Sequence, residues 1–212
     1  MSALVTPVGQ CVIVQGISWD TYTCLLADFV DSSGIRIAYD QGTLELMAPS
    51  FNHEHVADLL ADIVKAVAEA QELDFVPAGS TTFKREDVER GFAPDASFYV
   101  QHAAAVRGQN VIDLDVDPPP DMIIEIDISH PSLDKFPIYA ALGVPEVWRY
   151  VGQQVHIHRR SETTYVEILA SAVLPGVTSD YLTQWVQRGL ELPRLTWIRR
   201  VRAWAASLTE AP

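Results

Sequence analysis

The sequence predicts an α/β protein with a central mixed β-sheet flanked by helices. Two apolar runs of strand length, residues 94–100 and 121–127, have the composition of buried core strands. Residues 52–73, which precede them, carry apolar side chains at helical spacing and predict a long helix. A shorter helix and further strands follow. Adjacent strands with helices before and after them in the chain indicate a layered sandwich.

The first part of the chain predicts short elements and a hairpin before the long helix. Ser18 can cap a helix whose apolar positions follow helical spacing, and Asn52 can cap the long helix. The turn Asp40-Gln41-Gly42 is typical of a β-hairpin. The strands expected here cover residues 12–14, 35–39, 43–47, 75–76 and 81–84.

The second part of the chain predicts a long connecting segment, a helix, a three-stranded meander and a helical tail. Residues 101–120 are too long for a structureless connection, so we expect them to cover something or to contain a short helix. Pro137 fits the first turn of a helix that begins at Asp134 and ends at Gly143. The meander strands cover residues 147–151, 155–158 and 165–169. We expect three parts: an N-terminal strand and helix (1–34), a core (35–170) and a C-terminal helical extension packed on it (171–212).

Composition restricts the class of protein. The 212 residues suit one domain with at most a small appendage, and no apolar run approaches the ~20 residues of a membrane span. Two cysteines are too few for a disulfide framework, so a reduced, cytoplasmic location is the default expectation. The net charge of −13 argues against a nucleic-acid coat protein. Seven acids and no Lys or Arg lie within residues 108–134, which suits a metal site beside a polyanion but equally an arbitrary surface.

Three carboxylates occupy the two core strands, where an ionised group loses hydration that only a partner or a metal replaces. Glu125 and Asp127 share one face of their strand because side chains alternate, and Asp95 starts the other strand. If the strands are neighbours, Asp95 and Glu125 can converge on a Mg²⁺ (or Mn²⁺) ion, with the Ile126 carbonyl as a further oxygen ligand. Such an ion would activate water for attack on a phosphate.

Each of these acids also has an ordinary structural interpretation. Pro94-Asp95 is common turn chemistry, and Glu125 could pair with a buried Lys or Arg. Asp127 could equally be a solvent-facing residue at the strand end.

The pattern Pro94-Asp95 followed by Glu125-Ile126-Asp127 resembles the PD-(D/E)XK restriction-endonuclease-like superfamily. The segments 119–126, 135–140 and 143–148 are similar to the Uma-type family of restriction endonucleases within it, and the likeness spans roughly residues 29–159. This resemblance implies a restriction-endonuclease-like sandwich and a metal-dependent nuclease.

The superfamily pattern places a lysine two residues after the Glu, where this chain has Asp127. The resemblance points to Lys135 as the relocated lysine, with Lys84 as the other candidate. A lysine in this role stabilises the attacking water or the developing phosphate charge. Glu54, at the start of the long helix, and Glu45, on the hairpin, could support the site from a second layer. The ordinary structural alternative is that Glu54 only complements the helix dipole and that Glu45 faces solvent.

The sequence and the resemblance therefore predict a Mg²⁺-dependent endodeoxyribonuclease, a hydrolase that acts on DNA and could work as a homodimer. The alternative is a binding module that kept the nuclease fold and lost turnover, which Asp127 in place of lysine favours. A hydrolase of small phosphoesters is a third interpretation.

Overall fold

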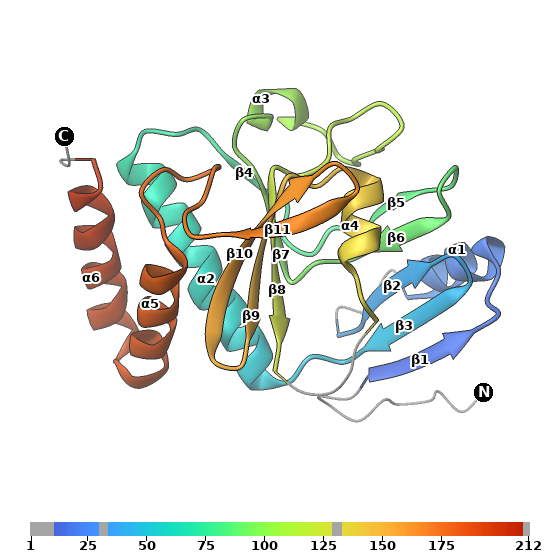
Figure 1. Ribbon diagram of the computed structural model, residues 1–212, viewed down its shortest axis with the longest axis horizontal. Coiled ribbons are helices and arrows are strands. Elements are labelled where there is room, and N and C mark those ends of the chain that lie inside the picture. The colour runs from blue at the N-terminus through green and yellow to red at the C-terminus, as the bar shows by residue number, and fades with distance from the viewer. Residues whose placement is uncertain (1–10, 30–33, 129–132, 210–212) are drawn as a thin grey trace.

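The computed structural model describes residues 11–29, 34–128 and 133–209, which fold into two β-sheets flanked by helices (Figure 1). The mixed α/β class predicted from the sequence is confirmed, and the protein has a second sheet besides the single central one that was expected. No helix in these ranges is long and apolar enough to cross a membrane.

The larger sheet contains six strands within the described ranges. They are β4 (Val76–Pro77), β7 (Ala96–Tyr99), β8 (Met122–Asp127), β9 (Glu146–Val151), β10 (Gln154–Ser161) and β11 (Thr164–Ile168). Their order is β11-β10-β9-β8-β7-β4, in which β8 and β9 run parallel and the other pairs run antiparallel. The sheet is therefore mixed, and the two strands predicted to carry the acids, β7 and β8, are neighbours.

The smaller sheet is antiparallel and has five strands among the residues described. They are β1 (Cys11–Gln15), β2 (Arg36–Asp40), β3 (Thr43–Met47), β5 (Phe83–Arg85) and β6 (Arg90–Phe92), in the order β1-β3-β2-β6-β5. The hairpin predicted around Gly42 is the β2–β3 pair, and β1 adds to its outer edge. Helix α1 (Trp19–Asp28) packs Trp19 and Tyr22 against this sheet and is capped by the predicted Ser18.

Helices cover the two faces of the larger sheet differently. The long helix α2 (Phe51–Ala70), α5 (Ser179–Glu191) and α6 (Arg194–Ser207) bury the face that carries Met122, Ile124 and Ile126. The opposite face, with Ile123, packs on α4 (Phe136–Leu142) and on Phe83 and Phe92 of the smaller sheet. Figure 1 shows α4 between the two sheets, with α2, α5 and α6 on the far side. Glu125 shares the face of Ile123 and therefore points toward α4.

Several local predictions need correction. Ser50, not Asn52, caps α2, because its hydroxyl accepts the His53 N–H, and the helix ends at Ala70. Lys135, not Asp134, occupies the N-cap position of α4, although an Asp134 carboxylate oxygen still accepts the Phe136 N–H at 3.2 Å.

Other expectations for the connecting and terminal segments are confirmed. Gly143 ends α4 in the left-handed conformation, with φ of 85°. The excursion contains the short helix α3 (Ala103–Val106), and the meander is β9–β10–β11. Strand β6 is the element that the sequence pattern did not reveal.

Candidate active site

Asp95 and Glu125 lie at the same end of the antiparallel pair β7–β8. The register ends with Ala96 opposite Ile124, and Asp95 and Glu125 are the next residues along the two segments. The Asp95 N–H donates to the Ile124 carbonyl at 3.2 Å, and the Ile126 N–H donates to Asp95 Oδ2 at 2.8 Å. Asp95 and Glu125 therefore lie on adjacent segments at one end of the β7–β8 pair. That they share one metal ion stays a prediction.

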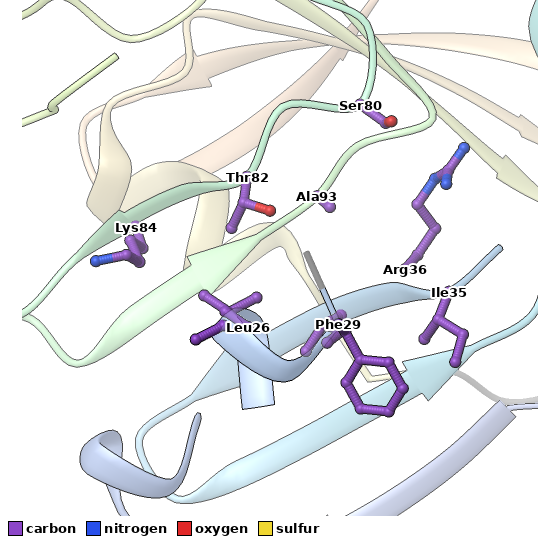
Figure 2. Close-up of a pocket in the computed structure, with 10 residues that line it drawn as sticks. Leu26, Phe29, Ile35, Arg36, Ser80, Thr82, Lys84 and Ala93 are labelled. Atoms are coloured by element: carbon purple, nitrogen blue, oxygen red, sulfur yellow. The ribbon is translucent and has the colours of Figure 1, made fainter. Parts of the chain in front are cut away.

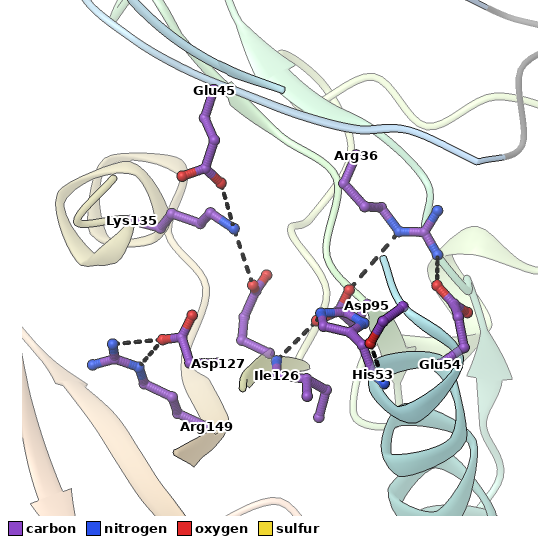
Figure 3. A network of polar contacts seen from close by, with 11 residues as sticks. Arg36, Glu45, His53, Glu54, Asp95, Ile126, Asp127, Lys135 and Arg149 are labelled. Carbon is purple, nitrogen blue, oxygen red and sulfur yellow. Dashed lines mark hydrogen bonds and ion pairs between the residues drawn. The ribbon is translucent and has the colours of Figure 1, made fainter. Parts of the chain in front are cut away.

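Lys135 joins this pair from the start of α4. Its Nζ lies 3.5 Å from Glu125 Oε2 and 3.0 Å from Glu45 Oε1. Glu45 is buried on β3, and its second oxygen accepts the Leu133 N–H at 2.7 Å. Glu45 thus contacts the site through Lys135 instead of facing solvent, and it holds the ammonium between two carboxylates (Figure 3).

Arg36, His53 and Glu54 approach Asp95 from the other side (Figure 3). His53 Nε2 lies 3.3 Å from Asp95 Oδ2, and Arg36 Nε lies 3.9 Å from Asp95 Oδ1. Arg36 also donates to Glu54 Oε1 at 3.2 Å. Glu54 therefore reaches the site indirectly, through the Arg36 guanidinium.

Asp127 pairs with Arg149 of the neighbouring strand, and Lys84 lies on the smaller sheet. Asp127 Oδ2 accepts from the Arg149 guanidinium at 2.6 and 2.7 Å, which couples the end of β8 to β9. Lys84 lies on β5 with its ammonium 5.7 Å from the Trp19 ring centroid. Of the two lysines considered from the sequence, Lys135 is the one beside Glu125.

Burial dominates the electrostatics of the two acids. It raises the pKa of Asp95 to about 7 against the opposing effects of Lys135, the Ile126 N–H and Arg36. Burial likewise raises the pKa of Glu125 to about 8, with Lys135 opposing and Asp95 adding to the increase. For Lys135, burial disfavours the charged form, but Glu125, Glu45 and Asp95 outweigh it and the pKa rises. Two carboxyls buried on adjacent segments favour either bound protons or a further cation.

The donor set fits a hard cation such as Mg²⁺. Glu125 Oε1 is buried and has no hydrogen-bond partner in the described part of the chain. With Asp95 and the Ile126 carbonyl it offers oxygen ligands, which Mg²⁺ prefers, and Mg²⁺ typically retains several waters. Within the described ranges, no group of three or more His, Cys, Asp or Glu side chains is arranged to hold a metal. The protein would therefore contribute two carboxylates and leave the remaining positions to the backbone, water or substrate.

Sequence reasoning missed three residues of this cluster. Arg36 and His53 come from β2 and α2, and Tyr139 on α4 acts to lower the pKa of Glu125. For Tyr139 the sequence did carry a signal. It lies four residues after Lys135, and this spacing directs both side chains toward Glu125.

Two buried acids and a lysine thus lie between the start of β7, the end of β8 and the start of α4 in an α/β fold. Comparison with known proteins identifies the family. Residues 19–193 match the model of the Uma2 family, described as putative restriction endonucleases, and the chain belongs to that family.

A solved structure supports the same fold. The chain is similar to a crystal structure described as a putative nuclease belonging to DUF820 from Anabaena variabilis, at 14% sequence identity and a TM-score of 0.50. That alignment covers 71% of this chain and 90% of the other. No curated protein sequence matches this chain.

Proposed function

We propose that the protein is a Mg²⁺-dependent (or Mn²⁺-dependent) endonuclease that hydrolyses DNA phosphodiester bonds. The observation that carries the proposal is the buried pair Asp95 and Glu125 on adjacent strands, with the Lys135 ammonium 3.5 Å from Glu125. Membership in a family described as restriction endonucleases supports a nuclease. The metal, the substrate and the role of each residue are part of the proposal.

Asp95, Glu125 and the Ile126 carbonyl would hold the ion in this proposal. The bound ion would lower the pKa of water and stabilise charge on a phosphate under attack. The Ile126 N–H fixes the Asp95 carboxylate at 2.8 Å, which leaves its other oxygen directed toward Arg36. A carboxylate held this way loses little conformational freedom when a ligand arrives.

Lys135 would place a fixed positive charge beside the phosphate. Its ammonium is held by Glu45 at 3.0 Å, so its position does not depend on the substrate. Preorganised charge of this kind stabilises negative charge that develops in the transition state. Asp127 would assist indirectly, because its carboxylate engages Arg149 and keeps that guanidinium at the end of β8.

Cleavage of supercoiled plasmid and of branched or single-stranded DNA tests the proposal. The unaltered protein should cleave with Mg²⁺ or Mn²⁺ and not with EDTA. Asp95→Asn and Glu125→Gln should each lower the rate by about 100-fold or more, because each removes a charged ligand. Glu69→Gln, which removes an exposed carboxylate on α2, is the matched control and should cleave normally.

The same experiment distinguishes the inactive binding module. A protein that binds DNA but cleaves no substrate with either metal would reject the nuclease proposal and favour the module. Activity confined to mononucleotide phosphoesters would favour the third interpretation. The homodimer and the cytoplasmic location stay predictions from the sequence.

A further inference from the structure

A separate pocket of about 520 Å³ lies next to the carboxylate site, between α1, β2 and the segment that enters β5 (Figure 2). One wall is apolar and includes Leu26, Phe29 and Ile35, and the other is polar and includes Ser80, Thr82 and Lys84. Its volume falls within the range of about 300–1,000 Å³ that is typical of small-molecule sites.

Arg36 connects this pocket to the acids. It lines the pocket, and the same side chain lies 3.9 Å from Asp95 and 3.2 Å from Glu54. Ala93, which also lines the pocket, precedes Asp95 by two residues. A strand whose phosphate lay at Asp95 would therefore place its next nucleotide close to the pocket.

A basic residue borders the pocket at each end. Lys84 lies at one end, with its ammonium directed away from the other lining residues, and Arg36 lies at the other end (Figure 2). Lys84 contacts the Trp19 ring and pairs with no carboxylate among the residues described. The chain has a net charge of −13, so a lysine that pairs with no described carboxylate and lies beside a pocket offers local attraction to an anion.

The polar wall adds hydrogen-bonding capacity. In the described ranges, the Ser80 and Thr82 hydroxyls make no hydrogen bond within the protein. Hydroxyls bind phosphate and sugar oxygens readily, and an aromatic or aliphatic wall suits a base. Phosphate groups on both sides of a single base match the two cations and the apolar wall between them.

We propose that this pocket holds one unstacked nucleotide of the DNA strand, adjacent to the phosphate at Asp95 and Glu125. The inference rests on the proposed nuclease function and makes it more specific. Bases in a duplex are stacked and paired, so a one-nucleotide pocket selects single-stranded, branched or flipped segments. The substrate class is therefore DNA with an unpaired nucleotide at the cleavage position.

Binding measured without cleavage tests the pocket independently of activity. Fluorescence anisotropy in EDTA at low salt would follow a labelled single-stranded oligonucleotide. Lys84→Glu should weaken binding about tenfold and should reduce the slope of log affinity against log salt by about 1. Lys65→Glu makes the same charge change at a half-exposed lysine on α2 that is paired with Asp62, and should bind nearly as the unaltered chain does.

A filling variant tests the cavity without removing a charge. Thr82→Trp places a large side chain into the pocket wall and should weaken binding to a similar extent, with thermal unfolding confirming that the variant is folded. An oligonucleotide with one abasic position should lose about tenfold in affinity at that position, because the base no longer contacts the wall. A fully paired duplex should bind more weakly than the single strand.

Several results would overturn the proposal that this pocket binds a nucleotide of the DNA strand. These are unchanged affinity in both Lys84→Glu and Thr82→Trp, tighter binding of the duplex, or no measurable oligonucleotide binding by the unaltered chain. Equal affinity for free dAMP would assign the pocket to mononucleotides and reject a strand as its occupant. If binding depends on the pocket while no metal supports cleavage, the pocket stands and the nuclease proposal fails.

Discussion

Glu125→Gln gives the sharpest test of the buried acid pair, because it should change how the stability of the metal-free protein depends on pH. In the unfolded chain a glutamic acid titrates near 4.5, whereas burial raises the pKa of Glu125 in the folded protein to about 8. Between these values the folded protein holds a proton that the unfolded chain has released. Raising the pH therefore favours unfolding throughout this window.

The size of the effect follows from proton linkage. Each proton held only by the folded state lowers the free energy of unfolding by up to about 1.4 kcal/mol per pH unit. Asp95 acts in the same direction between 3.8 and about 7, so both acids contribute between about pH 5 and 7. In the unaltered protein the two acids together should lower the free energy of unfolding by up to about 2.7 kcal/mol for each unit that the pH rises. In the Glu125→Gln variant the free energy of unfolding should fall by at most about half as much per pH unit.

Urea unfolding in EDTA at several pH values, followed by the fluorescence of the five tryptophans, measures these slopes. Burial lowers the pKa of His53, which contributes a slope of opposite sign below about 6.5. This contribution is present in both proteins and largely cancels in the difference. Glu69→Gln should leave the slope unchanged. Equal slopes for the unaltered protein and Glu125→Gln would refute the reasoning, because they would mean that Glu125 is ionised when buried.

Three further outcomes follow from the same contacts. Mg²⁺ at 100 times its dissociation constant should stabilise the unaltered protein by about 2.7 kcal/mol in thermal unfolding, and Asp95→Asn should remove the gain. Lys135→Met should lower the free energy of unfolding by about 3–5 kcal/mol at pH 8 in urea titration, because Glu45 and Glu125 lose their shared cation. Gly91→Ala should cost about 1–3 kcal/mol in the same assay, since its Cβ would lie 2.9 Å from Lys84 Cβ and closer still to the Tyr22 hydroxyl.

Local sequence patterns were sufficient for most of the fold. Helical spacing and Pro or Gly boundaries identify α2, α4 and the meander, because these signals lie within one segment. The N-cap of α2 was misplaced because Ser50 and Asn52 are both good caps, and only the hydrogen bond to His53 distinguishes them. Strand β6 was missed because three residues that include Gly91 carry little strand signal, and pairing with β2 and β5 defines the strand instead.

The same distinction applies to the candidate site: some of its residues are indicated by their own segment, and others only by the packing of distant segments. Asp95 and Glu125 could be predicted because an acid inside an apolar strand is conspicuous in the sequence alone. Arg36 and His53 could not, since each lies on an element whose own pattern explains it, and only packing brings both to Asp95. Distances between separate elements are a property of the fold, and no residue spacing encodes them.

Asp127 shows how the structure resolves a departure that the sequence could only flag. The parallel register of β8 and β9 sets Arg149 beside Glu125, and its guanidinium turns to Asp127 at 2.6 Å. The position two residues after Glu125 therefore carries a paired acid whose charge a neighbouring strand balances. The cation that faces Glu125 comes instead from Lys135, at the start of α4. In the proposed nuclease, Lys135 at the start of α4 would take the role of a lysine on the strand, because that role needs a positive charge near the acids and not a particular element to supply it.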